Sequence, residues 1–299
     1  MARAVSLIED EDASAAALIR DIFPHTGRSY LIGVTGPPGA GKSTLVDKLT
    51  AETRQAGETV GVLAVDPTSP FTGGAILGDR LRMQTHAQDE HVFIRSMATR
   101  GHMGGLSRTT GDAALVLDAA GKSLVIIETV GVGQDEVDIV RTADVSIVVL
   151  VPGTGDDVQA LKAGIMEIAD IYVVNKCDRE GAERMVTSIE SNLALQSFGD
   201  GEWRPPIVKT EANTGRGVAE LWQTIAAFRT HSEGARIKRL KARNEFRLRD
   251  LLTHRFMEYV ERDVLGTEPF EALVERIARR EVDPYTAASD ILSRALKHS

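Results

Sequence analysis

The chain contains 299 residues, of which 42% are hydrophobic and 26% are charged, and its formal net charge is -8. This composition excludes a disordered, collagen-like or disulfide-stabilised chain, and the acidic balance argues against nucleic-acid binding, because that affinity comes largely from Lys and Arg. No apolar run reaches the roughly 18 residues that a membrane helix needs. The acidic stretch at residues 1–23 lacks the pattern of a secretory signal or a mitochondrial presequence. We therefore expect a cytoplasmic protein without membrane contact, whose one cysteine, Cys177, stays reduced.

The predicted elements begin with a short helical segment in residues 1–29, where Ala15, Leu18, Ile19 and Ile22 follow helical spacing. Between residues 30 and 228, short β-branched runs alternate with longer amphipathic segments, which predicts parallel strands connected by crossover helices. We therefore predict an α/β fold with a doubly wound, mostly parallel sheet, whose ligands lie at the carboxyl ends of the strands. The strand runs are Tyr30–Thr35, Val60–Val65, Val92–Ser96, Leu124–Glu128, Val145–Val151, Ile171–Asn175 and Ile207–Thr210.

Residues 229–299 form a C-terminal helical region, because the chain from Ile237 to His298 shows helical periodicity and no strand run. Amphipathic helices must bury their apolar faces. These helices either pack back on the sheet domain or form a dimerisation arm, and both remain open. The stretch Arg229–Arg255 carries nine Lys or Arg against three Asp or Glu. It is either a solvated helix face or a docking surface for an acidic partner or a phosphorylated cofactor.

A phosphate-binding motif follows the first predicted strand. It is the pattern G-x-x-x-x-G-K-[ST] with a strand before it and a helix after it, and its glycines let backbone N–H groups turn toward a phosphate. Lys42 is expected to reach the β- and γ-phosphates, and Ser43 to ligate Mg²⁺. The motif therefore predicts a P-loop fold that binds a nucleoside triphosphate. Its residues are Gly36, Pro37, Pro38, Gly39, Ala40, Gly41, Lys42, Ser43 and Thr44.

Three carboxylates are candidate Mg²⁺ ligands beside Ser43. Asp66 ends the second predicted strand and Glu128 ends the fourth, so both are expected near the phosphate loop, whereas Asp79 lies in the glycine-rich stretch Phe71–Arg80. Mg²⁺ keeps several waters and takes oxygens from the phosphates, so one or two carboxylates suffice. A helix cap or a plain loop carboxylate is the alternative role for each.

Candidate base-binding residues follow the last two predicted strands. Asn175, Lys176 and Asp178 form an N-K-x-D motif. The Asp178 carboxylate can accept two hydrogen bonds from N1 and N2 of guanine, which adenine cannot supply, so the motif favours GTP over ATP. The residues after the seventh strand, where a G protein closes over the base by backbone contact, either do the same or form a simple turn. They are Thr210, Glu211, Ala212 and Asn213.

The segment Glu128–Gly131 occupies the place where a GTPase carries Asp-x-x-Gly. Gly131 would offer a backbone N–H to the γ-phosphate, so the segment is a candidate switch. Val132 stands where a Ras-like protein carries the glutamine that orients water, and we therefore expect slow unaided hydrolysis. The catalytic candidates are Lys42, Glu128 and Gln134. Further positive charge would come from a partner or from one of Arg80, Arg82, Arg95, Arg100 and Arg108.

Six segments of the chain carry a more specific signal than the P-loop alone. They are GPPGAGKST, VLAVDPTSPFTGGAILGDRLRM, FIRSMATRGHMGGLSR, IIETVGVGQDEVDI, VVLVPGTGDDVQALKAGIMEIADIYVVNKCD and VDPYTAASDIL. Together they resemble the methylmalonyl-CoA mutase-associated GTPases, the MeaB/ArgK type of P-loop protein. The resemblance is close over about residues 30–228 and looser in the helical tail.

This resemblance implies a GTP-hydrolysing switch that acts as a chaperone of an adenosylcobalamin-dependent acyl-CoA mutase, gating cofactor loading and protection. It also implies a homodimer, Mg²⁺ as cofactor, GTP and GDP as substrate and product, and adenosylcobalamin met only through the partner. By position, Asp66–Arg82 and Glu128–Asp138 would be switches and Gly153–Gly164 a third loop, in which Lys162 is a candidate for coupling to the partner. The residues that would surround Mg²⁺ are Ser43, Asp66, Asp79 and Glu128. The identity of the client mutase stays open.

Two other functions remain as alternatives. A metal-delivery GTPase shares the same nucleotide domain, but soft and borderline metals favour clustered Cys and His, and the seven histidines show no paired spacing. A P-loop kinase would ordinarily use ATP, which the guanine-selective Asp178 disfavours.

Overall fold

The computed structural model describes residues 1–67, 84–86, 88–99, 105–129, 142–153, 168–265 and 270–297, and for residues 66, 67, 84, 98, 99, 105–107 and 297 it describes the backbone alone. The chain divides into two compact units, Met1–Arg243 and Asn244–Ser299.

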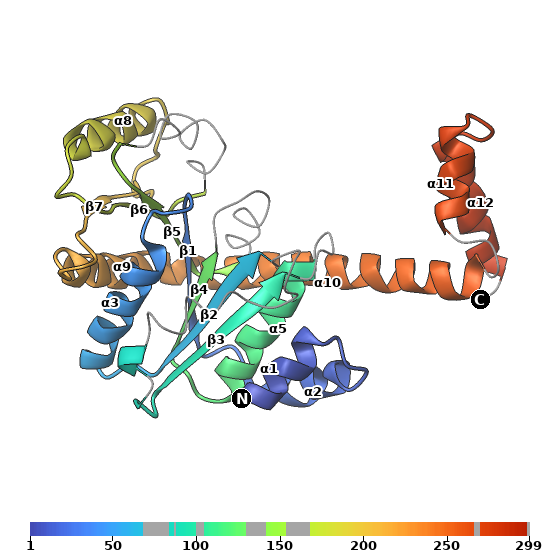
Figure 1. The fold of residues 1–299 in the computed structure, drawn as a ribbon, viewed down its shortest axis with the longest axis horizontal. Helices are drawn as coiled ribbons and strands as arrows, with labels where there is room; N and C mark the ends of the chain where they lie inside the picture. Colours follow the sequence, from blue (N-terminus) through green and yellow to red (C-terminus); the bar gives the residue numbers. More distant parts are fainter. Residues whose placement is uncertain are drawn as a thin grey trace. The chain divides into compact units, whose positions relative to one another are not determined.

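The first unit is built on a parallel sheet that has seven strands among the described residues (Figure 1). The order is β3-β2-β4-β1-β5-β6-β7, and all neighbouring strands pair in parallel. Because β1 is central and its neighbours lead away in both directions, a crevice opens at the carboxyl ends of the middle strands. The predicted doubly wound α/β fold is confirmed. The strands are β1 (Tyr30–Thr35), β2 (Val60–Pro67), β3 (Val92–Thr99), β4 (Leu124–Thr129), β5 (Val145–Leu150), β6 (Ile171–Val174) and β7 (Ile207–Lys209).

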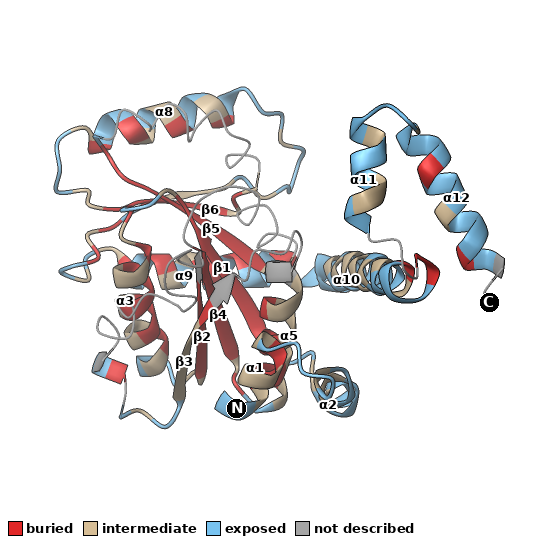
Figure 2. Cartoon of the chain, turned by 45° about the vertical axis from the view of Figure 1, so that its right-hand side comes forward, coloured by how far each residue is buried: buried red, intermediate tan, exposed pale blue. Residues whose placement is uncertain are grey.

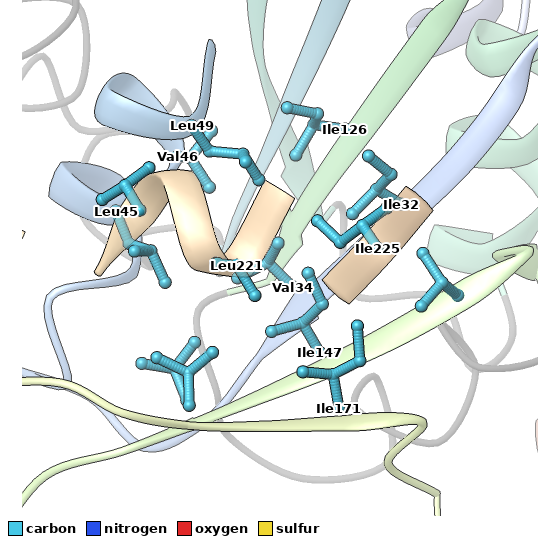
Figure 3. Packing of buried hydrophobic residues seen from close by; sticks show 14 of the residues in the cluster. Ile32, Val34, Leu45, Val46, Leu49, Ile126, Ile147, Ile171, Leu221 and Ile225 are labelled. Atoms are coloured by element: carbon cyan, nitrogen blue, oxygen red, sulfur yellow. The ribbon is translucent and has the colours of Figure 1, made fainter. Parts of the chain in front are cut away.

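One face of the sheet is covered by α3 (Lys42–Gln55) and α9 (Val218–Ser232). Leu45, Val46 and Leu49 share one side of α3, as residues three to four positions apart do in a helix. They pack with Leu221 and Ile225 of α9 against strand residues, as Figure 3 shows. This buried layer fixes α3, the helix that starts at the phosphate loop. The labelled strand residues are Ile32, Val34, Ile126, Ile147 and Ile171.

The other face is covered by α5 (Gly105–Ala119), α1 (Ala2–Glu9), α2 (Ala15–Ile22) and α8 (Ala182–Ala194). Leu31, Leu63 and Ile127 pack toward α5, while Val148 and Tyr172 pack toward α8. The central strands are therefore buried on both sides, which Figure 2 shows as red strands between helices with exposed outer faces. Continuous apolar runs such as those of β4 and β5 are typical of strands with two covered faces.

Two aspartates bind backbone N–H groups at the amino ends of the strands. Asp144 Oδ2 accepts a hydrogen bond from the Leu31 N–H at 2.9 Å, and Asp170 Oδ2 accepts one from the Ser146 N–H at 2.9 Å. Arg239, at the start of α10 (Arg236–Tyr259), donates to the Asp144 carbonyl at 2.7 Å and lies 3.7 Å from Asp170 Oδ1. Burial raises the pKa of the Asp170 carboxyl to about 6, with backbone bonding and Arg239 acting in the opposite direction. The first turns of α10 are thus held to the end of the strands that is opposite the phosphate loop.

The second unit contains the remainder of α10 followed by α11 (Phe270–Ala278) and α12 (Pro284–Lys297). Val260, Val264, Leu265 and Ala295 form its small buried cluster. The predicted helical character of the C-terminal region is confirmed, and its role as a dimerisation arm stays a prediction. Within the described residues, no helix is long and apolar enough to cross a bilayer. Shorter helical turns are Phe23–His25, Gln84–His86, Glu233–Ala235 and the π-turn Val260–Val264.

Candidate functional site

The phosphate loop leaves β1 at Thr35, and α3 begins at Lys42. Gly36, Gly39 and Gly41 have φ angles of 142°, 77° and 83°, which residues with a Cβ rarely adopt. A Cβ on Gly36 would also clash with the carbonyl oxygen of Val149. The motif glycines are therefore required by the backbone, which turns so that the first residues of α3 line a pocket. A helix amino terminus presents free N–H groups and a partial positive charge to an anion.

Lys42 is the first residue of α3, and its side chain folds back over the loop. Its Nζ donates hydrogen bonds to the carbonyl oxygens of Gly36 at 2.6 Å and Pro37 at 3.0 Å. The residue is 6% exposed and lines the pocket. The ammonium group and the amino end of α3 thus supply positive charge at one place, which suits phosphate oxygens.

Ser43 and Glu128 meet across the gap between α3 and β4. Ser43 Oγ donates a hydrogen bond to Glu128 Oε1 at 2.6 Å, and Glu128 is 5% exposed. Both residues line the pocket, as do Ala64 and Val65 of the neighbouring strand β2. A hydroxyl and a carboxylate are hard oxygen ligands of the kind Mg²⁺ accepts. The chemistry of this pair therefore fits the predicted ion.

The remaining predicted metal and switch residues are placed less completely. Asp66 belongs to β2, in register with Ala98 of β3, and its side chain is outside the described residues. The predicted roles of several residues stay predictions because the residues lie wholly outside the described part of the chain: Asp79, Gly131, Gln134 and Lys162.

Asn175 connects three segments at the other end of the pocket. Its Nδ2 donates to the carbonyl of Ala40 in the phosphate loop at 2.8 Å. Its Oδ1 accepts hydrogen bonds from Thr210 Oγ1 and from the Ala212 N–H, both at 3.1 Å. Lys176, held at a φ of 56°, adds a bond from Nζ to the Gly39 carbonyl at 2.7 Å. The N-K-x-D segment is therefore fastened to the phosphate loop, which sets the distance between the two halves of the site.

The pocket enclosed by these segments has a volume of about 500 Å³. Most of the predicted residues line it, including residues of the phosphate loop and Asp178. Gly36, Pro37, Ala40 and Thr210 do not line it and act from behind through the contacts above. The predicted residues that line it are Pro38, Gly39, Gly41, Lys42, Ser43, Thr44, Glu128, Asn175, Lys176, Asp178, Glu211, Ala212 and Asn213.

Three lining residues were not predicted. Ala64 and Val65 precede Asp66, and Arg179 follows Asp178 directly. These residues could have been predicted from their positions next to predicted residues, because consecutive backbone groups at a strand end or in a turn face the same cavity.

Two of the arginines considered as charge donors have other partners. Arg95 of β3 forms an ion pair with Glu9 of α1 and donates to Ser6 Oγ at 3.0 Å. Arg108 of α5 forms an ion pair with Glu11 at 2.6 Å. Neither lines the pocket, so both serve here to fasten the N-terminal segment. The other candidates, Arg80, Arg82 and Arg100, lie outside the described residues.

Comparison with known proteins gives a consistent result. Residues 1–264 match the family model described as "Methylmalonyl Co-A mutase-associated GTPase MeaB". A relative from Pyrococcus abyssi is 50% identical over 301 residues, covering 99% of this chain and 92% of its own length. The "GTPase ArgK" of Escherichia coli is 40% identical over 237 residues, covering 77% of this chain and 72% of its own.

Among solved structures, the crystal structure titled "LAO/AO transport system kinase" is similar with a TM-score of 0.71 and 27% sequence identity, covering 98% of this chain and 91% of that one. This match extends the similarity from the sequence to the arrangement of strands and helices. The family model and the relatives confirm the resemblance seen in the sequence motifs: the chain belongs to the family of methylmalonyl-CoA mutase-associated GTPases of the MeaB type.

Proposed function

We propose that this chain is a Mg²⁺-dependent GTPase whose conformational switching serves an adenosylcobalamin-dependent acyl-CoA mutase of the methylmalonyl-CoA mutase type. The observation that carries the proposal is one pocket in which Lys42, Ser43, Glu128 and Asp178 line the same cavity. A phosphate site, a pair of hard oxygen ligands and a guanine-selective carboxylate are the parts that GTP hydrolysis requires.

The nucleotide would lie with its phosphates on the loop and on the amino end of α3, and with its base toward Asp178. The Asp178 carboxylate would accept hydrogen bonds from guanine N1 and N2, an arrangement that adenine cannot satisfy. The bonds from Asn175 and Lys176 to the carbonyls of Ala40 and Gly39 support this pose, because they hold the base segment and the phosphate loop at a fixed separation.

Ser43 and Glu128 would hold Mg²⁺, and Asp66 and Asp79 remain proposed ligands by position in the chain. When bound, the ion would neutralise charge on the β- and γ-phosphate oxygens. Ser43 would present its hydroxyl oxygen, and Glu128 would orient that hydroxyl through the contact seen at 2.6 Å.

Hydrolysis would proceed by in-line attack of a water on the γ-phosphorus. The new P–O bond forms as the bond to the β-phosphate oxygen breaks, leaving GDP and inorganic phosphate. Lys42 would stabilise the negative charge on the transferred group from the position its ammonium already occupies beside the loop. Gln134 is the proposed side chain for orienting the water. Because Val132 occupies the position of the usual glutamine, the basal rate should be slow and should rise when a partner orders the switch segments.

The proposed partner and assembly state rest on the family and on the surface of the second unit. The family description names association with methylmalonyl-CoA mutase, and adenosylcobalamin would be met only through that enzyme. Tyr285 and Leu296 of α12 are 87% and 79% exposed, and α10 and α11 also carry exposed apolar residues. Exposed apolar surface favours protein contact, so a homodimer is part of this proposal. The free thiol of Cys177 is compatible with the proposed cytoplasmic location.

The two alternatives are less well supported. Within the described residues, no group of three or more His, Cys, Asp or Glu side chains could hold a metal as cargo. A kinase that uses ATP would leave the Asp178 carboxylate facing an adenine that cannot donate to it in the same way.

The test is the steady-state hydrolysis of GTP and of ATP by the purified chain in Mg²⁺ and in EDTA, alone and with an adenosylcobalamin-dependent mutase. We expect slow, Mg²⁺-dependent hydrolysis of GTP in preference to ATP, and at least about a tenfold increase with the mutase, equal to about 1.4 kcal/mol of barrier. Preference for ATP would overturn the GTPase assignment. Absence of stimulation by such mutases would overturn the partner assignment alone.

A further inference from the structure

Two buried threonines lie at the strand ends that lead into the site. Thr35 is the last residue of β1, directly before Gly36, and Thr129 is the last residue of β4, directly after Glu128. The two residues are 0% and 3% exposed. Thr129 Oγ1 donates a hydrogen bond to Thr35 Oγ1 at 3.0 Å. This bond joins the two strands at the point where they end, one position beyond the paired residues Val34 and Glu128.

The hydroxyl pair lies on the opposite face of the sheet from the contact between Ser43 and Glu128. Successive side chains of a strand point to opposite faces. Glu128 reaches Ser43 on the α3 side, so Thr129 points to the other face, and neither threonine lines the pocket. The pair therefore acts on the site only through the backbone, by fixing where β4 ends relative to the strand that carries the phosphate loop.

We propose that Thr35 and Thr129 are positioning residues that hold Glu128 at Ser43 and so set the Mg²⁺ affinity of the nucleotide site. The inference rests on the proposed function. A hydrogen bond between two buried hydroxyls resists separation, because each group would otherwise lose its partner away from water. On its other side, Thr129 is in register with Val65 of β2, which lines the pocket. The pair thus links β1, which leads into the phosphate loop, to β4, which carries Glu128 and pairs in turn with β2, the strand of Asp66.

The test is the affinity of the full chain for GDP, measured by fluorescence titration in excess Mg²⁺ and again in EDTA. Thr129→Val removes the donor and keeps a branched side chain of similar size. We expect it to reduce the gain in affinity that Mg²⁺ provides by about three- to tenfold, the factor that one net hydrogen bond is worth. Its affinity in EDTA should match that of the unaltered chain.

Two further variants separate positioning from packing. Thr129→Ser retains the hydroxyl and should restore the Mg²⁺-dependent gain. Thr50→Val is the matched control, since Thr50 of α3 is 0% exposed and its hydroxyl has no hydrogen-bond partner within the described chain. It should leave both affinities unchanged.

Specific outcomes overturn the inference. In Thr129→Val, either an equal loss of GDP affinity with and without Mg²⁺ or a Mg²⁺-dependent gain in affinity equal to that of the wild type would do so. A Thr129→Ser variant that behaves like Thr129→Val would do so as well. If Thr129→Val fails to fold, the double variant Thr35→Val with Thr129→Val replaces it, because it leaves neither hydroxyl without its partner; a wild-type gain in that variant equally refutes the role. A wild-type chain that binds GDP equally in Mg²⁺ and EDTA would overturn the Mg²⁺-dependent function itself, and the inference with it.

Discussion

Replacing Asn175 with Ala should weaken nucleotide binding, because this side chain connects the phosphate loop to the segment after β7. The side chain makes three hydrogen bonds, at 2.8 Å to Ala40 and at 3.1 Å to both Thr210 and Ala212. A net hydrogen bond contributes about 0.5–1.5 kcal/mol, so the three together amount to about 1.5–4.5 kcal/mol of unfolding free energy. All four residues are 3% exposed or less, which leaves little access for water to replace the lost bonds.

Part of that loss should appear as weaker binding. Without Asn175, the phosphate loop and the segment after β7 lose the side chain that connects them directly, and the nucleotide must order them as it binds. If about 2 kcal/mol of the loss is transferred to binding, the dissociation constant for GDP rises about 30-fold.

The assay is a GDP titration followed by fluorescence, together with urea unfolding of the same samples. Asn192→Ala on α8 is the matched control, because Asn192 makes one side-chain hydrogen bond, to the Ser188 carbonyl at 3.0 Å, and does not line the pocket. Asn175→Asp tests the donor specifically, since it keeps an acceptor for Thr210 and Ala212 while turning an oxygen toward the Ala40 carbonyl. An Asn175→Ala variant whose GDP affinity equals that of the Asn192→Ala control would refute the reasoning.

Three further changes test other parts of the site and of the fold. Lys42→Ala should reduce the GTP turnover number by at least about 100-fold, because the ammonium beside the loop stabilises the transferred charge; retained turnover would refute the phosphate-site assignment. Asp178→Asn should lower GTP affinity by about 100-fold or more and change ATP affinity little, since only guanine loses two charge-assisted bonds; equal losses would contradict the guanine assignment. Asp170→Asn should remove a pH dependence of stability. Because the pKa of Asp170 is raised from 3.8 to about 6 in the folded chain, the folded chain binds the proton more tightly than the unfolded chain. The unfolding free energy of the wild type should therefore fall, relative to that of the variant, as the pH rises from 4 to 6, by up to about 3 kcal/mol. If the unfolding free energies of the two proteins change in parallel across that pH range, this role of Asp170 is excluded.

Local sequence pattern was sufficient for the strands, and it located the P-loop and N-K-x-D residues that the fold brings to one pocket. β-branched apolar runs such as those of β4 and β5 form strands because both faces are covered, and the glycines of the phosphate loop are required by φ angles that other residues avoid. The order of the strands was not predicted, since it depends on contacts between segments far apart in the chain. The same limit applies to Asn175, whose bond to Ala40 spans 135 positions.

Arg95 and Arg108 illustrate why sequence could not separate catalytic from structural charges. Both were candidates for the positive charge that the switch segment lacks. Their partners Glu9 and Glu11 lie 86 and 97 positions away along the chain, and no periodicity links them. In the fold these ion pairs hold the N-terminal segment to β3 and α5. The sequence pattern alone does not distinguish such a structural arginine from a catalytic one.

The two ends of β6 affect different properties of the protein, its stability and its nucleotide affinity. β6 has four residues, with Asp170 directly before it and Asn175 directly after it, and strands rise about 3.3 Å per residue, so these side chains are attached roughly 16 Å apart. Energetic effects usually become independent beyond about 7–10 Å when no partner is shared, and the partners here, Ser146 and Ala40, differ. The Asp170→Asn change should therefore alter the stability of the folded chain while leaving GDP affinity at its wild-type value, whereas Asn175→Ala changes both. A strand that is buried on both faces can in this way carry a docking contact for α10 at one end and the proposed base site at the other, and neither end constrains the sequence of the other.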